Sequence, residues 1–469
     1  MTVPTPTSEY LDINTATFTD QSAPVDIDDQ HNPDAGATFD GVNDYKTTAV
    51  TPFTSAGGAS NSFSVWIKTP NTETVNTNIM CQLDTGVSNK RAFTLTHLGA
   101  GSGGLQIQWR GPTDVIWMNA EIVAGMLDWD DDTWRLITGT VTDTVAKIYI
   151  GGVEASSYAN QSENGTYTGP PAAPSTLALG GLTNGGGYYA GSLSRPKFWE
   201  GTTLSDAQVL EEFNNECAAV VAPTPTTEYL DLSTATFTAN GGAVLTDDQH
   251  GSDNCYITDG VNDYLSTSVK PFTTGSGLEH SQSTWIKWDN TTSGGMAVNQ
   301  QLTASNRGFY IISNTTLTVE YGSVGTNILT RAIIAAGMLD WDDGEWHLIT
   351  STVNATLVKI YVDGVEATAY TDQTDSGWVG FPASITTLGI SAKANGSGNF
   401  AACTVSRPKW WLGTELSECE VLAEYNAEFA SIGEGFLVGG IQGGLGRPDF
   451  RLDMIRQTRY NKGLPRFRR

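Results

Sequence analysis

The strongest constraint on the fold is that the chain contains the same set of sequence motifs twice. Residues 40–45 and residues 259–264 both read DGVNDY, and residues 125–131 and 337–343 both read GMLDWDD. The motifs follow one another in the same order in both halves, with loops of slightly different length between them. A repeat of this size is a duplicated domain and is far longer than a solenoid unit.

Within each copy, short runs alternate between apolar and polar residues. Residues 63–67 (FSVWI), 93–97 (FTLTH) and 105–109 (LQIQW) show this period of two, which places one face of a strand on a core. Asp363 and Gly364 separate two such runs and suit a tight hairpin turn. Many short strands joined by Gly-rich turns predict an all-β sandwich in each copy.

One helix is predicted at the end of each copy. Residues 205–208 (SDAQ) and 417–420 (SECE) are capping boxes, and apolar residues at helical spacing follow both. The sequence therefore predicts a first domain over residues 1–218, a second over residues 219–430, and a C-terminal arm over residues 431–469. The apolar linker before residue 223 indicates limited freedom between the domains.

Composition narrows the possible partners. The 469 residues carry a formal net charge of −26, which argues against nucleic acid binding by the body because phosphates would be repelled. The opening residues do not predict a secretory signal, and the apolar runs are shorter than a membrane span requires. The five cysteines do not recur at matching positions, so we interpret them as small buried hydrophobic residues.

The ordered motifs resemble a known family. DGVNDY, FSVWI, Trp134, residues 361–364 (YVDG) and the closing helix are similar to the laminin-G-like branch of the concanavalin A-like lectin/glucanase superfamily. The resemblance covers about residues 1–430 and implies a jelly roll of two antiparallel sheets in each copy. It also implies binding of carbohydrate or protein, often with calcium.

Hydrolysis is not expected. Glucanases of this superfamily need closely spaced Glu and Asp residues on one strand, and neither copy contains such a run. The nearest carboxylates, residues 128 and 130–132, flank Trp129 on a turn and are interpreted as solvated or N–H-capping groups. His31 and His250 occupy matching positions, but neither has a recurring nucleophile beside it.

Calcium binding is the stronger chemical alternative. The turns that follow two predicted strands offer hard oxygen ligands from Asp40, Asn43, Asp44, Asp259, Asn262 and Asp263. Asp and Asn in such turns also bond their own backbone, and this interpretation explains the residues without a metal. We favour the turn interpretation and leave calcium open.

Aromatic residues outside the family motifs are candidates for stacking on a sugar ring. We predict a ligand-binding site from Trp109, Arg110, Trp117 and Tyr321, within a wider aromatic set that adds Tyr188, Tyr189, Trp288 and Trp378. The alternative is that these aromatic residues belong to the core.

The arm differs in charge from the rest of the chain. Residues 431–469 hold eight basic residues against three acidic ones, whereas the preceding 430 residues hold 17 against 48. Apolar side chains between the charges could anchor the arm on a partner surface. The predicted anchors are Arg447, Phe450, Arg451, Arg456, Arg459, Arg466, Arg468 and Arg469. The alternative is that the arm folds back onto its own acidic domains.

These observations favour a non-enzymatic structural or adhesion protein. We expect a decoration or fibre component of a virus or phage particle, located on the virion surface and joined to capsid or tail proteins by the arm. Cell-surface glycans are the second class of expected partner. The alternatives are a free or secreted extracellular carbohydrate-binding protein and, third, a cryptic glycosidase.

Overall fold

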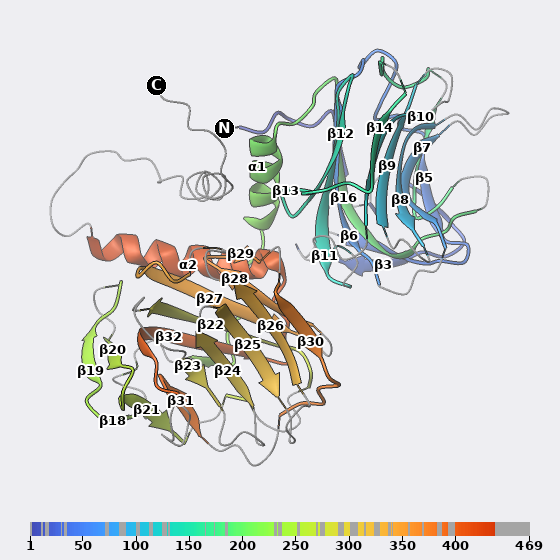
Figure 1. The fold of residues 1–469 in the computed structure, drawn as a ribbon. Coiled ribbons are helices and arrows are strands. Elements are labelled where there is room, and N and C mark those ends of the chain that lie inside the picture. The colour runs from blue at the N-terminus through green and yellow to red at the C-terminus, as the bar shows by residue number, and fades with distance from the viewer. Residues whose placement is uncertain are drawn as a thin grey trace, which may run out of the picture. The chain divides into compact units, whose positions relative to one another are not determined.

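The computed structural model contains two compact units, Met1–Val220 and Val221–Arg469 (Figure 1). We call them the first and second domain. The structure describes residues 2–436 outside the segments 11–12, 15–17, 30, 32–34, 71–74, 84–90, 100–103, 112–115, 124–128, 130–131, 165, 173, 183–185, 229–231, 233–236, 251–253, 269–270, 273–276, 289–294, 301–307, 314–315, 323–328, 336–338, 340, 355–356, 368–369, 382–386 and 393–398.

The first domain is a sandwich of two antiparallel sheets. The helix-side sheet has the order β13 (Val153–Glu154), β12 (Ala146–Ile150), β11 (Trp134–Val141), β6 (Asn61–Lys68), β16 (Ala190–Glu200), β4 (Ala35–Asp40) and β3 (Val25–Asp28), with β1 (Ser8–Glu9) on β16. The outer sheet has the order β14 (Asn160–Glu163), β10 (Ile116–Ile122), β9 (Gly104–Arg110), β8 (Arg91–Leu98), β7 (Thr77–Leu83), β15 (Thr176–Leu179), β5 (Tyr45–Thr48) and β2 (Thr19–Gln21).

The second domain repeats this arrangement. Its helix-side sheet has the order β19 (Val244–Asp247), β20 (Asn254–Asp259), β32 (Ala402–Leu412), β22 (His280–Trp288), β27 (Trp346–Val353), β28 (Val358–Val362) and β29 (Val365–Glu366), with β17 (Thr227–Glu228) on β32. Its outer sheet has the order β18 (Thr238–Asn240), β21 (Tyr264–Thr267), β31 (Leu388–Ile390), β23 (Gly295–Asn299), β24 (Phe309–Ser313), β25 (Thr316–Gly322), β26 (Leu329–Ala335) and β30 (Asp372–Asp375). The prediction of two all-β sandwiches is confirmed.

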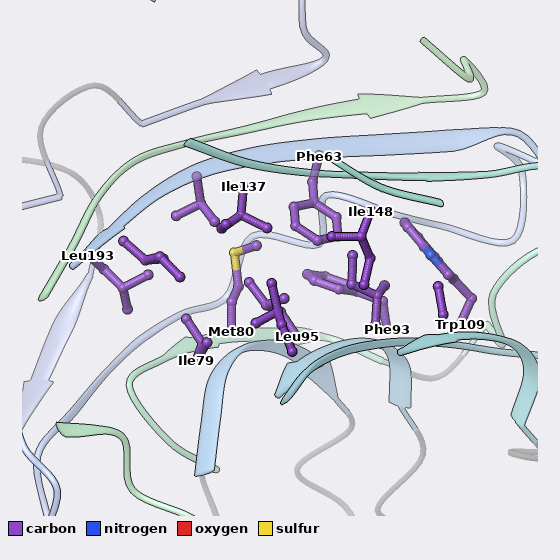
Figure 2. Close-up of a cluster of buried hydrophobic side chains, with 14 of the residues drawn as sticks. Phe63, Ile79, Met80, Phe93, Leu95, Trp109, Ile137, Ile148 and Leu193 are labelled. Atoms are coloured by element: carbon purple, nitrogen blue, oxygen red, sulfur yellow. The ribbon is translucent and has the colours of Figure 1, made fainter. Parts of the chain in front are cut away.

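The core of each domain lies between its two sheets. In the first domain, Phe63 and Ile137 of the helix-side sheet face Phe93, Leu95 and Trp109 of the outer sheet (Figure 2). These side chains come from alternate positions of their strands, as a period of two requires. The polar residues between them point to the opposite faces of the sheets.

One helix follows each sandwich and packs on its helix-side sheet. In α1 (Asp206–Cys217), the Ser205 N–H donates to Gln208 Oε1 over 3.0 Å, and in α2 (Glu418–Phe436) the Ser417 N–H donates to Glu420 Oε2 over 2.7 Å. Both capping boxes are therefore confirmed. The second helix continues beyond residue 430, where the predicted arm begins.

A buried ion cluster fastens α1 to its sheet. Lys197 Nζ lies 3.0 Å from Glu212 Oε1 and 2.5 Å from Glu216 Oε1. Arg195 Nε donates to Glu216 Oε2 over 2.8 Å, and Trp66 Nε1 donates to the same oxygen over 3.0 Å. Burial of these charges is tolerated because each one has charged partners of opposite sign.

The second domain contains the same cluster under α2. Lys409 Nζ lies 2.9 Å from Glu424 Oε1 and 2.6 Å from Glu428 Oε1, and Arg407 Nε lies 2.8 Å from Glu428 Oε2. The Trp285 indole N–H donates to Glu428 Oε2 over 3.2 Å. The lysine side chain is about one-tenth exposed in each copy, so the cluster is an interior feature.

The two histidines at matching positions, for which the sequence predicted no role, each lie in the buried ion cluster of their domain. His31 lies between two carboxylates, with Nδ1 3.5 Å from Asp29 Oδ2 and Nε2 3.6 Å from Glu216 Oε2. His250 repeats the arrangement and also lies with Nε2 3.2 Å from the carbonyl oxygen of Glu428. Each histidine therefore connects the first part of its domain to the closing helix.

The two cores differ at one set of matching positions. In the first domain the Phe63 ring occupies the space above Gly139, where an added Cβ would lie 2.5 Å from Phe63 Cε1. The second domain has Ser351 at this position, and its hydroxyl oxygen lies 2.8 Å from the Tyr321 hydroxyl and accepts from Gln282 Nε2 over 3.3 Å. At these positions the first domain therefore has aromatic packing, whereas the second domain has a buried network of hydrogen bonds.

The cysteines follow the sequence interpretation only in part. Cys81, Cys255 and Cys403 are free and buried, as expected of small hydrophobic residues. Cys217 and Cys419 are disulfide-bonded, which corrects the interpretation for these two.

We expect each domain to fold when it is expressed alone, because each holds a complete pair of sheets, its own core and its own ion cluster. Residues 1–220 and residues 221–436 should each give a β-type circular dichroism spectrum and a cooperative melting transition. An unfolded half beside a folded full chain would contradict this division.

Candidate functional site

Most of the predicted sugar-stacking residues lie in the cores. Trp109 projects from β9 between the two sheets of the first domain and is fully buried (Figure 2). Tyr321 occupies the matching position in β25 and is also fully buried. Neither ring has a face available to a sugar, because core packing covers both sides.

The wider aromatic set gives a similar result. Tyr189, Trp288 and Trp378 are buried, whereas Tyr188 is half-buried with its ring centroid 6.1 Å from that of Tyr45. Trp117 belongs to β10, and its side chain lies outside the described residues. Among the predicted ligand-binding side chains that the structure describes, Arg110 alone therefore reaches a sheet surface.

The predicted calcium turns use their carboxylates to hold backbone N–H groups. Asp40 Oδ1 accepts from the N–H groups of Val42 and Asn43 over 2.8 and 3.2 Å, and Asp44 Oδ1 accepts from Ala23. These backbone hydrogen bonds lower the pKa of Asp40. This arrangement favours the turn interpretation over a metal site.

The second copy shows the same pattern. Asp259 Oδ1 accepts from Val261 and Asn262, and the two Asp263 carboxylate oxygens accept from the N–H groups of Gly242 and Asp259. Across the described residues, no group of three His, Cys, Asp or Glu side chains is arranged to hold a metal ion.

A polar surface does lie on the outer sheet of the first domain. Along β9, the residues between the core positions are Gln106, Gln108 and Arg110, and all three are half-buried on the face that points away from the core. Figure 1 places this sheet on the far side of the sandwich from α1, so the helix does not cover the face. Strand alternation places the polar side chains there together.

These side chains form a directed chain of hydrogen bonds. Arg110 Nη2 donates to Gln108 Oε1 over 3.3 Å, Gln108 Nε2 donates to Gln106 Oε1 over 2.9 Å, and Gln106 Nε2 donates to Glu121 Oε2 over 3.0 Å. We call this chain the amide ladder. A cation begins it and a carboxylate ends it, which fixes the orientation of both amides.

Two buried polar side chains beside the ladder have no hydrogen-bond partner among the described residues. Asn119 of β10 pairs with Gln108 in the strand register, and Thr94 of β8 pairs with Gln108 from the other side. Asn119 is 4 % exposed, and neither Nδ2 nor Oδ1 has a hydrogen bond; the hydroxyl of Thr94 is also without one. Buried polar groups usually have partners, so these atoms are suited to bind a ligand or water.

The matching surface of the second domain is internally paired. Tyr310 and Glu320 replace Thr94 and Gln108, and the Tyr310 hydroxyl donates to Glu320 Oε2 over 2.5 Å. Arg331 replaces Asn119 and donates to Asp372 through Nε over 3.0 Å. The duplication therefore left an amide surface in one domain and a closed set of charged pairs in the other.

Sequence comparison identifies the family of both domains. A model of the concanavalin A-like lectin/glucanases superfamily matches residues 40–210 and residues 259–414. The two matches cover more than half of the chain and lie one in each domain. The chain belongs to this superfamily.

Several solved structures are similar to this chain at low sequence identity. Domain 4 of an extracellular arabinanase from Geobacillus stearothermophilus, solved with arabinotriose, is 15% identical and covers 44% of this chain and 97% of its own, with a TM-score of 0.32. The botulinum neurotoxin serotype D binding domain is 10% identical, covers 88% and 98%, and has a TM-score of 0.37. Domains LG4-5 of the mouse laminin alpha1 chain are 12% identical, cover 84% and 95%, and have a TM-score of 0.26. A comparison with curated proteins found no match.

Other predictions for this superfamily member stay predictions. The arm anchors from Arg447 to Arg469 lie outside the described residues, so attachment to capsid or tail proteins and the virion location are not tested. No helix in the described part of the chain has the length and hydropathy needed to cross a bilayer.

The amide ladder was missed at the sequence level, although a signal was present. In β9 the sequence prediction of a ligand site included Trp109 and Arg110 but not the glutamines at 106 and 108. These two glutamines alternate with core residues, and Asn119 and Glu121 alternate in the same way in the next strand. Asking which polar residues share a face across neighbouring strands would have found this surface.

Proposed function

We propose that the chain is a non-catalytic glycan-binding protein and that the amide ladder of the first domain is its binding surface. The observation that carries the proposal is the unpartnered Asn119 side chain beside two oriented amides. Sugar hydroxyls both donate and accept hydrogen bonds, and amide groups match them in both roles. The family supports a binding function as well, because its members include lectins.

The charge balance selects a neutral glycan. Arg110 and Glu121 lie at opposite ends of the ladder, so the surface has no excess of cations to hold a sulfate or carboxylate. The chain as a whole carries a charge of −26, which repels acidic polysaccharides. We therefore expect neutral oligosaccharides to bind and heparin-like chains not to bind.

We expect the Asn119→Ala variant of the full chain to bind neutral glycans about thirtyfold more weakly, because it removes two hydrogen bonds to the glycan of about 1 kcal/mol each. Affinity is measured by calorimetry after a glycan array has identified a ligand. The melting temperature should not fall, because the removed amide has no partner in the protein.

The matched control is Thr318→Ala, at the position in the second domain that corresponds to Gln106. It should leave glycan binding unchanged. Binding that survives Asn119→Ala, or that is lost with Thr318→Ala, would place the glycan elsewhere. Release of reducing ends from a bound oligosaccharide would contradict the non-catalytic part of the proposal.

A further inference from the structure

The edge of the second domain's helix-side sheet carries an exposed apolar patch. Val244 of β19 pairs with Ile257 of β20, and the two side chains are 59 % and 46 % exposed. Beside them lies an open pocket of about 450 Å³ that also has Gly241, Asp259 and Asp263 in its lining. We call this region the edge patch. Within the described residues, β19 pairs only with β20, so its other side is an open sheet edge.

The helix that precedes the C-terminal arm lies beside the loop that follows β19. His250, three residues beyond the end of β19, lies with Nε2 3.2 Å from the carbonyl oxygen of Glu428 in α2. Figure 1 accordingly shows the last part of α2 on the side of the domain where β19 and β20 lie. Ten residues separate the end of α2 from Arg447, and an extended segment of ten residues can span roughly 33 Å.

The charge and the apolar pattern of the arm match the edge patch. Asp259 of the edge patch and Asp247 at the other end of β19 are both exposed, and the arm is the basic part of an otherwise acidic chain. In an extended segment, Phe450, Leu452 and Met454 share one face, because strand side chains alternate. Such a segment could cover the apolar pair with this face while its arginines meet the carboxylates.

The first domain provides a natural comparison. Its edge strand β3 carries Val25, but the partner position in β4 is Thr38, whose hydroxyl lies 2.8 Å from that of Ser192. The apolar pair is therefore present in the domain that the arm follows and is interrupted in the other.

We propose that residues 447–460 lie along the open edge of β19 and cover the edge patch of their own second domain. This docking is independent of glycan binding by the first domain. It assigns to the arm an intramolecular partner, which was one of the two alternatives that its charge allowed.

Hydrogen exchange measured on the full chain tests the proposal. In the variant with Arg451→Glu, Arg456→Glu and Arg459→Glu, the backbone amides of residues 244–247 should exchange about tenfold or more faster than in the unmodified chain. The variant Ile257→Thr should have the same effect, and it introduces the residue that the first domain has at this position. High salt should accelerate exchange in the unmodified chain, because it screens the ion pairs.

The matched control is Val25→Thr in the first domain, which should leave exchange at residues 244–247 unchanged. Equal exchange in the unmodified chain, the arm variant and Ile257→Thr would overturn the proposal. Protection that disappears on tenfold dilution, together with dimers in sedimentation, would also overturn it, because the arm of a second copy would then be the occupant.

Discussion

The variant Glu428→Ala is expected to destabilise the second domain by about 3–5 kcal/mol, because it leaves buried cations without their carboxylate. Glu428 contacts Lys409 Nζ, Arg407 Nε and the Trp285 indole N–H over 2.6, 2.8 and 3.2 Å. The lysine would keep Glu424 at 2.9 Å and the more exposed Glu228 at 3.4 Å, whereas Arg407 would lose the carboxylate that it contacts. The free energy of unfolding is measured by urea titration of the full chain, following the transition of the second domain.

Two comparisons separate this effect from a general loss of charge. Glu216→Ala should cost the first domain a similar free energy, since Lys197, Arg195 and Trp66 meet that carboxylate in the same way. Glu279→Ala removes an exposed carboxylate of the second domain and should change the free energy of unfolding by less than about 0.5 kcal/mol. A loss below about 1 kcal/mol for Glu428→Ala would show that the cluster contributes little.

The second domain is also expected to lose stability as the pH rises from about 6.5 to about 9. His347 Nδ1 lies 2.8 Å from Asp363 Oδ2, and Nε2 lies 3.0 Å from Asp343 Oδ1. Burial alone lowers the pKa of His347, but hydrogen bonds and charge from Asp363 and Asp343 outweigh burial and raise the pKa to about 9. The raised pKa stabilises the folded state fully below the unfolded pKa of about 6.5, and this contribution disappears as the pH passes 9.

The size of the pH effect follows from the shift. A rise in the pKa of His347 from 6.5 to about 9 corresponds to a loss in the free energy of unfolding on the order of 3 kcal/mol as the pH rises across this range. Urea titrations between pH 6 and pH 9.5 measure it. The variant His347→Arg should flatten the dependence while keeping a cation in place, and Arg135 occupies the matching position in the first domain. An unchanged slope in this variant would assign the pH dependence to other groups.

Motif order was enough to predict the two sandwiches because strands and turns leave local patterns. The alternating pattern sorted the side chains of β9 into two faces. The predicted sugar site required Trp109 to lie on the solvent-facing one. Gln106 and Gln108 occupy the solvent-facing side instead, and Trp109 lies in the core, because burial stabilises a large aromatic side chain more than an amide. The aromatic sugar site was therefore drawn from core residues.

The ion clusters could not be predicted in the same way. Lys197 and Glu216 meet only because β16 and α1 pack together, and no local period joins them. The duplication does give one sequence signal of the clusters, because residues 194–197 and 406–409 both read SRPK. In both copies the arginine has a positive φ, 49° and 50°, at a register shift in its strand. Such backbone geometry is unfavourable for a side-chain-bearing residue and could not be inferred from the sequence.

The two cores differ in that Phe63 packs over Gly139 in the first domain, whereas Gln282 donates to Ser351 in the second. This difference affects how a chain with two similar domains folds. During folding, a strand of one copy could insert into the sheet of the other, which is a common error in tandem repeats. If β22 took the place of β6, Gln282 would be buried among aromatic rings without the Ser351 hydroxyl that it contacts in its own domain. The unpaired amide would destabilise the exchanged form. Divergence inside the cores thus gives each half of the chain a preference for its own strands.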